Sequence, residues 1–508
     1  MKVIIIGSGL SGLTAGAYLI SEGYDVIIYE QNDLIGGVTA TIRKDGFSWD
    51  LGPLLLDGFA PYESAAKTMK ELDIYDHVEF IRDDRGQSFP DFDIWKPEKY
   101  EGPLWRKSFF TRLFPEEKEG LNDYYKLYDK MMNILALGDK LDWAKGLKTF
   151  FLKIKLYLKL LTIFKKLKWS AQELMDYYFS NDKLKAVFTG ILADFVVKPS
   201  EFPGLGVPTV NVESAFDIRI PLDIKEGKLP TYHYIKGGCQ NLVDAFADKI
   251  LSQGGKIETN KLVKKIIVEN NIIKGVQLED GEIISSDLVI ASGGIQKVFY
   301  DQVGKDKLPQ SLIEQIEKIV YMGSVLMVHI GIDFDPSSFQ KKPLCYYYRT
   351  YDIETSIEEC REGIYHEGKE GFLIYIPSFH TPEMAPEGKH AITIYTIAPY
   401  RLKDRNWDKR REELAEKLLI EAEKIIPNLR KGIETKIIMT PYDFEKRINV
   451  LRHSFGGTAP TMSQNNPSHR TPINGLWYIG AYSESGGGVA GVINGTRKAI
   501  KQLLENFQ

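Results

Sequence analysis

The chain has 508 residues, 43% of them apolar and 26% charged, so it is long enough for about two or three domains with a large core. Its formal net charge of −4 gives no general attraction for nucleic acid, and we find no nucleic-acid-binding motif. The three cysteines show no CxxC or metal-ligand spacing, which argues against a disulfide-rich secreted protein and favours a cytoplasmic, reducing compartment.

The first thirty residues predict a dinucleotide-binding unit of strand, glycine turn, helix and strand. Residues 3–6 are all β-branched, as in a parallel strand covered on both faces, and the second strand ends on Glu30. Glycines in the turn let the backbone approach a pyrophosphate, which would face the free N–H groups of the helix N-terminus. Glu30 lies about twenty residues further on, where an acid accepts hydrogen bonds from a ribose. The candidate contacts of the turn are Gly7, Gly9, Leu10, Ser11 and Gly12.

This apolar start does not read as a signal peptide or a membrane span. Lys2 alone is a poor basic region, and the glycine turn interrupts the apolar run. We therefore predict no transmembrane segment.

A glycine pair follows the second strand and begins a longer pattern that ends on Gly-Pro. The pattern resembles the extended fingerprint of the FAD-containing amine oxidase and phytoene desaturase superfamily. The resemblance implies bound FAD, with the glycine pair bringing a loop against its flavin side. Many members carry Arg directly after the pair, whereas this chain has Val38, which removes a cationic contact near the pyrophosphate or flavin. The candidate contacts here are Gly36, Gly37, Val38, Thr39, Gly52 and Pro53.

From about residue 91 to 229 the composition shifts to aromatics and lysines with few strand signals, which indicates the first part of a second, cap-like domain. Residues 114–135 predict a helix, because a proline and acids at its start precede an apolar repeat. This helix also resembles the FPEE-type helix of phytoene desaturase relatives.

Residues 143–169 have the most unusual composition, with eight lysines and no acid. Apolar side chains recur at three- and four-residue spacing, which predicts an amphipathic helix with an imperfect separation of its faces. Two interpretations stay open: a core-facing helix with a solvated basic face, or a helix in a membrane interface with its cations near anionic headgroups. The predicted apolar face holds Leu147, Phe150, Phe151, Ile154, Tyr157, Leu158, Leu161 and Phe164, and the opposite side holds Lys145, Lys148, Lys155, Lys159 and Lys166.

Residues 230–300 return to the pattern of the first domain. The YIKGG segment at 234–238 resembles the YPxGG turn that reopens the FAD domain in this superfamily, and short strands with Asn-Asn and Asp-Gly turns follow. By the same resemblance Val263 meets the adenine through its backbone. The segment 287–294 likewise resembles the returning strand of the FAD domain, which implies that Gly293 lies close to the cofactor.

Residues 301–420 read as the second part of the cap. Strands are predicted at 325–333 and 372–378, and 384–400 resembles the APEG turn and strand of phytoene desaturases. The aromatic content suggests a wall for an extended apolar ligand, although an ordinary sheet core also explains it.

The chain closes with a strand at 476–479 and a glycine triplet that opens a helix. In the phytoene desaturase and carotenoid isomerase group, a similar helix N-terminus points at the pyrimidine end of the flavin, where it stabilises negative charge. The candidate contacts are Gly480, Gly488 and Val489.

The sequence thus predicts an α/β protein with a Rossmann-like FAD-binding domain and a discontinuous α+β substrate (cap) domain. The FAD-binding domain is expected at 1–90, 230–300 and 421–508, and the cap at 91–229 and 301–420, with a membrane-associating helix within 143–169 as one option.

The resemblance predicts an FAD-dependent oxidoreductase similar to phytoene desaturases, carotenoid isomerases and retinol saturases, which acts on carbon–carbon bonds of a long apolar isoprenoid. An amine-oxidase-like enzyme and a lipid-binding chaperone of the Rab GDP-dissociation-inhibitor type are the alternatives. With no second dinucleotide motif, electrons would pass to or from a quinone, oxygen or another carrier. We expect no metal site. If a proton acceptor is used, Glu484 is a candidate and Tyr482 a second one, although a solvent-facing Glu484 is the simpler interpretation.

Overall fold

The computed structural model describes residues 1–52, 54–403, 406–453 and 455–505, so the predicted contact Pro53 lies outside the described residues. Its first sheet is parallel and has the strand order β12-β2-β1-β16-β22. The strands are β1 (Lys2–Ile6), β2 (Asp25–Tyr29), β12 (Lys256–Glu258), β16 (Leu288–Ala291) and β22 (Leu476–Tyr478). Three distant parts of the chain therefore build one sheet, as a discontinuous domain requires.

The sheet is covered on both faces, which explains its β-branched strands. Val3 and Ile5 pack into a core with the helices α1 (Leu10–Ser21), α9 (Gln240–Ser252) and α14 (Val489–Glu505). Ile4 and Ile6 point to the other face, against the antiparallel strands β13 (Val263–Glu269), β14 (Ile272–Leu278) and β15 (Ile283–Ser285). The predicted hairpin turns connect these three strands.

A second, mixed sheet of seven strands has the order β21-β17-β20-β19-β18-β7-β8. Its strands are β7 (Arg85–Ser88), β8 (Asp93–Ile94), β17 (Ser324–Ile332), β18 (Leu344–Tyr348), β19 (Gly371–Tyr375), β20 (His390–Ala398) and β21 (Ile433–Met439). The predicted boundaries at residues 90 and 421 divide this sheet, because β7 pairs with β18 and β21 pairs with β17. We propose that β7 and β21 be assigned with the cap, to which the predicted bounds already give the other five strands.

Helices cover both faces of the second sheet. One face packs on α12 (Trp407–Glu423), and the other joins a large core with helices from residues 105–210. The predicted helix at 114–135 begins as a 3-10 turn at Pro115–Glu117 and continues as α4. These helices are α3 (Trp105–Leu113), α4 (Lys118–Asp142), α6 (Ala171–Tyr178), α7 (Asp182–Thr189) and α8 (Val207–Val210).

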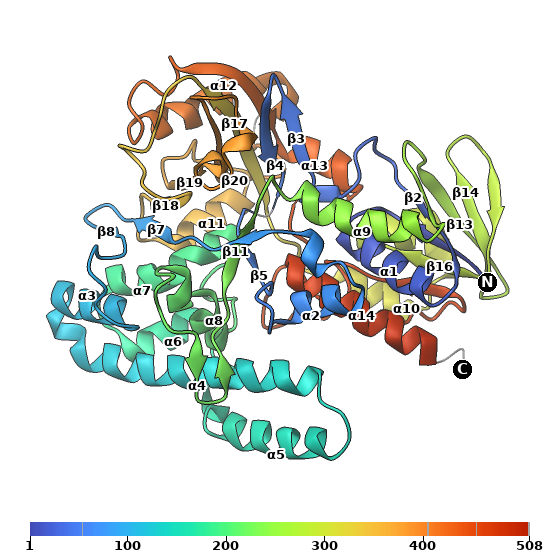
Figure 1. Ribbon diagram of the computed structural model, residues 1–508, viewed down its shortest axis with the longest axis horizontal. Coiled ribbons are helices and arrows are strands. Elements are labelled where there is room, and N and C mark those ends of the chain that lie inside the picture. Colours follow the sequence, from blue (N-terminus) through green and yellow to red (C-terminus); the bar gives the residue numbers. More distant parts are fainter. Residues whose placement is uncertain (53, 404–405, 454, 506–508) are drawn as a thin grey trace.

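The segment 143–169 forms α5 (Leu147–Leu161), which lies along α4 at one end of the molecule (Figure 1). The core-facing interpretation of this helix is wrong about its orientation. The predicted apolar face points to solvent, whereas Leu156 and Leu160 pack against the core, because their side of the helix meets α4. No helix in the described part of the chain is long and apolar enough to cross a bilayer.

Smaller elements connect the two sheets and complete the fold. The connecting strands are β3 (Thr41–Lys44), β4 (Phe47–Asp50), β5 (Leu56–Asp57), β6 (Phe80–Ile81), β9 (Asp223–Ile224), β10 (Gly227–Lys228) and β11 (Tyr232–Ile235). The remaining helices are α2 (Ser64–Glu71), α10 (Gln310–Glu317), α11 (Ile353–Arg361) and α13 (Pro441–Ile448). A parallel sheet with helices and a discontinuous α+β part confirms the predicted fold class.

Candidate active site

One large cavity, of about 1310 Å³, runs from the glycine turn after β1 to the seven-stranded sheet. Usual small-molecule sites hold about 300–1,000 Å³, so this cavity has room for a cofactor and a second ligand. Most predicted cofactor contacts line it. They are Gly7, Gly9, Leu10, Ser11, Glu30, Gly36, Gly37, Val38, Thr39, Gly52, Val263, Gly293, Gly480, Gly488 and Val489.

The glycines of the turn after β1 have different roles. Gly7 has φ +90°, and a Cβ on Gly12 would lie 1.9 Å from the carbonyl oxygen of Gly7, so Gly12 sets the packing of α1 on β1 from outside the cavity. A Cβ on Gly9 would meet no atom within 4 Å. Gly9 is also the N-cap of α1 and no side chain caps this end. The space before the helix N-terminus is therefore open and electropositive, which fits a pyrophosphate.

Glu30 is buried at the end of β2, and its neighbours fix its carboxylate. Ser8 donates to Oε2 from its backbone N–H at 2.9 Å and from its hydroxyl at 2.7 Å, and Asn32 donates to Oε1 at 2.9 and 2.7 Å. These bonds hold the acid at the cavity wall, where a ribose hydroxyl can reach it.

An arginine near the glycine pair was missed by the sequence analysis. Arg447 of α13 lines the cavity and donates from Nε to the Gly37 carbonyl at 3.0 Å and from Nη2 to the Leu34 carbonyl at 2.9 Å. It brings to this loop a cation that Val38 does not supply. The two residues are 410 positions apart in the sequence, and no local motif marks Arg447.

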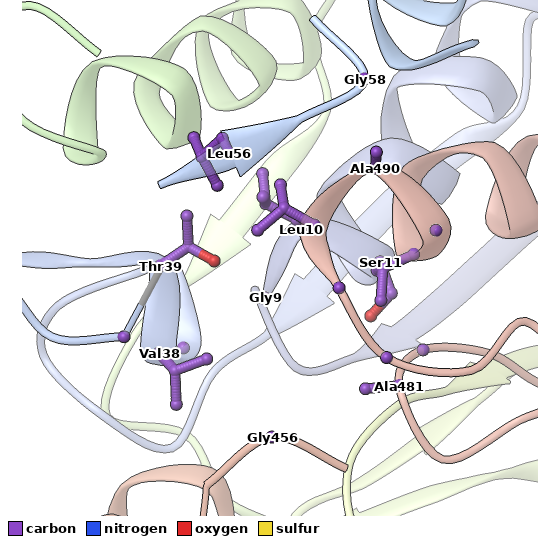
Figure 2. Close-up of a pocket in the computed structure, with 18 of the residues that line it drawn as sticks. Gly9, Leu10, Ser11, Val38, Thr39, Leu56, Gly58, Gly456, Ala481 and Ala490 are labelled. Atoms are coloured by element: carbon purple, nitrogen blue, oxygen red, sulfur yellow. The ribbon is translucent and has the colours of Figure 1, made fainter. Parts of the chain in front are cut away.

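The last glycine loop brings a second helix N-terminus to the cavity. α14 begins at Val489, directly after Gly488, whose φ of +85° favours glycine at this position. Figure 2 shows Val38 and Thr39 on one side of Gly9 and Ala490 of α14 on the other. The cradle between them is formed mainly by backbone and small side chains, as a large planar cofactor needs.

Beyond the cradle the cavity wall becomes apolar and aromatic. The wall comes from the helical layer and the seven-stranded sheet, and includes Ile191, Phe195, Phe202, Val210, Met322, Met327, Leu373, Tyr395 and Phe455. Such a wall gives van der Waals contact and excludes water but offers few polar groups to a ligand.

Two charged side chains interrupt this wall, and sequence analysis missed both. Arg85 is buried, donates from Nη2 to the Val210 carbonyl at 3.0 Å and lies over the Phe216 ring at 4.6 Å. Burial raises the pKa of Asp194 to about 7, although a hydrogen bond from Tyr346 and the charge of Arg85 oppose the shift. Asp194 can therefore exchange a proton near neutral pH.

The two predicted proton acceptors lie in different places. Tyr482 lines the cavity, its hydroxyl donates to the Phe455 carbonyl at 3.3 Å, and burial raises its pKa, so it stays protonated. Glu484 is exposed and does not line the cavity, and its Oε1 accepts from the backbone N–H of His469 at 2.8 Å. Glu484 therefore points away from the cavity, which does not favour it as a proton acceptor there. Among the described residues there is also no His, Cys, Asp and Glu group suited to a metal.

Comparisons with known proteins agree with this geometry. Residues 10–500 match the family described as flavin containing amine oxidoreductase. A 4,4'-diapophytoene desaturase (4,4'-diaponeurosporene-forming) of Staphylococcus aureus strain COL is 23% identical over 557 residues, covering 100% of this chain and 99% of the relative.

Two solved structures share the fold. An oxidoreductase from Methanosarcina mazei has a TM-score of 0.64 at 19% identity and covers 99% of this chain and 100% of its own. A Rab GDI from Plasmodium falciparum has a TM-score of 0.52 at 12% identity, covering 100% of this chain and 97% of its own.

The open glycine turn, the fixed acid on β2 and the two helix N-termini suit the phosphates, ribose and flavin of FAD, which is the cofactor. The family match extends over nearly the whole chain, so it includes both the cradle and the apolar wall. The chain therefore belongs to the family of flavin-containing amine oxidoreductases and is an FAD-dependent oxidoreductase.

Proposed function

We propose that this enzyme changes carbon–carbon bonds of a long apolar isoprenoid or carotenoid-like substrate, by desaturation, saturation or isomerisation. The observation that carries the proposal is the continuity of the FAD cradle with an apolar, aromatic wall in one cavity. The full-length likeness to a diapophytoene desaturase supports the same substrate class.

The cofactor contacts are proposed residue by residue. Gly9, Leu10 and Ser11 at the start of α1 would bind the pyrophosphate, and Glu30 the ribose. The adenine would lie by the backbone of Val263, and the flavin between the glycine-pair loop and the start of α14. Arg447 would hold that loop in place through the Gly37 carbonyl.

Bound FAD supplies a two-electron acceptor or donor for this chemistry. Desaturation of one C–C single bond removes a hydride and a proton from neighbouring carbons and leaves a double bond. The wall residues position the chain and exclude water, which an allylic cation would otherwise capture. Asp194 is the proton acceptor that we favour, because it lies in the apolar wall and burial raises its pKa to about 7, whereas Tyr482 remains protonated. Glu63 also lines the cavity with a pKa of about 7, but its carboxylate already accepts hydrogen bonds from Ala60 and Thr231.

The remaining partners are part of this proposal. Electrons leaving or entering the enzyme would pass through a quinone, oxygen or another carrier. An apolar substrate resides in membranes, and the exposed apolar face of α5 supports an enzyme that works at a membrane surface. The cytoplasm is the compartment that we propose, because the three cysteines favour a reducing environment.

Anaerobic incubation of oxidised and of reduced enzyme with carotenoids, prenyl chains and amines, followed by mass analysis, tests the proposal. We expect a change of two hydrogens, or an unchanged mass with altered retention, only in the isoprenoids. Oxidised amines with unchanged isoprenoids would favour the amine-oxidase alternative. A colourless protein that cannot be reconstituted with FAD would favour a lipid-binding chaperone.

A further inference from the structure

Among the described residues, exposed large apolar side chains are concentrated on one face of α5 and just after it. Nine large apolar side chains in and just after this helix are between 44% and 79% exposed. Soluble monomers rarely expose a contiguous apolar patch larger than a few hundred Å² unless it binds something. The nine are Leu147, Phe150, Phe151, Ile154, Tyr157, Leu158, Leu161, Phe164 and Leu167.

Seven of these side chains form one stripe along the helix. At about 100° per residue, the seven from Leu147 to Leu161 occupy one side of α5, and Leu152, Leu156 and Leu160 occupy the opposite side. Leu156 and Leu160 pack against the core, so the exposed stripe is not needed to hold the helix in place.

Lysines border the stripe on both flanks, with Lys148 on one and Lys153 on the other. Both are exposed, as are Lys145, Lys165 and Lys168 around the helix ends. The whole segment 143–169 has eight lysines and no acid. Two copies of this face would bring like charges together, whereas an anionic lipid surface would meet both the apolar stripe and the cations.

One part of the cavity rim, which we call the cavity mouth, lies beside this helix. The β9–β10 hairpin lies against α4 and α5, because the buried Glu226 pairs with Lys155 at 2.6 Å and with Lys159 at 3.3 Å. The Glu226 backbone N–H also donates to Asn133 of α4 at 2.9 Å. The adjoining residue Gly227 lines the cavity.

The rim of the cavity at this place is open to solvent. Lys140 at the end of α4 and Asp223 and Lys228 of the hairpin line the cavity and are also exposed. The cavity therefore reaches the surface next to the helix that carries the apolar stripe.

We propose that α5 lies in the interface of an anionic bilayer and that the apolar substrate enters from this bilayer between α4 and the β9–β10 hairpin. The docking part stands on α5 alone, while the entry part rests on the proposed function. The ion pairs of Lys155 and Lys159 with Glu226 hold α5 against the β9–β10 hairpin, next to the cavity mouth.

Co-sedimentation of the FAD-loaded full-length enzyme with lipid vesicles tests the docking. We expect binding to phosphatidylcholine vesicles that contain phosphatidylglycerol, with weaker binding to pure phosphatidylcholine and at high salt. The variant Phe150→Ser/Phe151→Ser/Leu158→Ser should lower partitioning by at least about tenfold, because the removed side chains supply the buried apolar area. Leu251→Ser/Ile283→Ser, which removes two exposed apolar side chains elsewhere, should bind as the wild type does.

The charge requirement has its own pair of variants. Lys148→Glu/Lys153→Glu should weaken binding to the anionic vesicles, and Lys264→Glu/Lys265→Glu on β13, which are also exposed, should not. A wild type that stays in the supernatant with both vesicle types would overturn the proposal. The proposal would also be overturned if the wild type did not bind vesicles but formed a dimer in sedimentation velocity that the serine variant abolishes. The apolar stripe would then be an interface with a second copy of the chain.

Substrate delivery tests the entry route and separates it from the proposed function. With substrate dissolved in detergent, the serine variant should turn over as fast as the wild type. With substrate in vesicles, the turnover rate of the serine variant should fall, relative to the wild type, by at least the same factor as its vesicle binding. Equal rates of the two proteins on vesicle-borne substrate would overturn the entry route, while absence of turnover in detergent for both would contradict the proposed function and leave the binding result intact.

Discussion

At the scale of single residues, the cradle depends on positions where a side chain is missing. Gly9 and Gly12 are three residues apart in one turn, yet an added Cβ would meet open cavity at Gly9 and the Gly7 carbonyl at Gly12. One glycine therefore makes room for a ligand and the other for the protein itself. Sequence alone identifies both as parts of the motif but cannot separate these roles.

This difference predicts the behaviour of Gly9→Ala. Gly9 has φ −65°, which alanine adopts without strain, so the variant should fold and melt like the wild type without cofactor. Its methyl group would occupy the phosphate space and raise the Kd for FAD at least about tenfold, which corresponds to about 1.4 kcal/mol. Fluorescence titration of the apoprotein with FAD measures this. Gly138→Ala in α4, also with no atom within 4 Å of its Cβ, is the control, and equal affinities of all three proteins would contradict the assignment.

Arg447 leads to a second residue-scale prediction. Hydrogen bonds from a charged group contribute about 1.5–3 kcal/mol each, so Arg447→Met should loosen the glycine-pair loop and weaken FAD binding roughly tenfold to a hundredfold. Arg452→Met changes an exposed arginine five residues away and should leave the affinity unchanged. The same titration decides, and an Arg447→Met protein with wild-type affinity would exclude this role.

At the scale of elements, the cap helices are joined by a buried ion pair. Arg106 of α3 donates from Nη1 to Oε1 of Glu213 at 3.1 Å, and its guanidinium stacks on the Phe216 ring at 3.6 Å. Tyr125 of α4 donates to the same carboxylate oxygen at 3.0 Å. Glu213 therefore links two helices to the segment that leads into β9.

Removing one charge of this pair should destabilise the cap strongly. Arg106→Met leaves Glu213 buried without its cation and should lower the free energy of unfolding by about 3–5 kcal/mol. Urea unfolding followed by tryptophan fluorescence measures the loss. The double variant Arg106→Met/Glu213→Gln should recover part of the stability, since it leaves no buried charge unpaired; a double variant less stable than the single one would refute this explanation.

The α5 helix shows the limit of sequence patterns at this scale. Its period predicts an amphipathic helix, but leucines fall on both sides, and only the packing of Leu156 and Leu160 on the core determines which side is exposed. The direction of the Glu484 side chain was equally hard to predict, because a position next to a glycine loop does not determine which way a side chain points.

At the scale of the whole molecule, the order of glycine motifs predicted most of the parallel sheet and its cradle. Each motif is local, and parallel strands must end at one edge, so distant motifs meet there. Arg85, Asp194 and Arg447 were not predictable in this way, since their positions at the cavity depend on tertiary packing between remote segments. The domain boundaries stay a prediction, and the assignment of β7 and β21 to the cap that we propose also depends on pairing between remote strands.

Buried acids and buried histidines make the free energy of unfolding depend on pH. Burial lowers the pKa of His329 to about 3, so between pH 6.5 and 3 the unfolded chain binds a proton that the folded chain does not, and stability is lost as the pH falls. Burial raises the pKa values of Glu63 and Asp194 to about 7, which acts in the opposite direction. The net slope combines both kinds of group.

A single variant isolates one of these contributions. His329→Gln should lose less stability than the wild type when the pH is lowered from about 7 to about 5, because glutamine does not titrate. His77→Gln, at an exposed histidine, should follow the wild type. Melting temperatures at both pH values give the comparison, and parallel losses in all three proteins would show that His329 does not contribute.

The central claim is that an FAD cradle and an apolar wall form one reaction site. The most direct test mixes the oxidised and, separately, the reduced holoenzyme anaerobically with a phytoene-like polyene, and the oxidised holoenzyme with amines. Flavin absorbance and the mass and retention of the products are measured in each case. We predict that the flavin absorbance bleaches and that the product has lost two hydrogens, or that reduced enzyme is reoxidised as the substrate gains two, or that the substrate isomerises without net redox change. A flavin that amines reduce, with every isoprenoid recovered unchanged in mass and retention, would contradict the account.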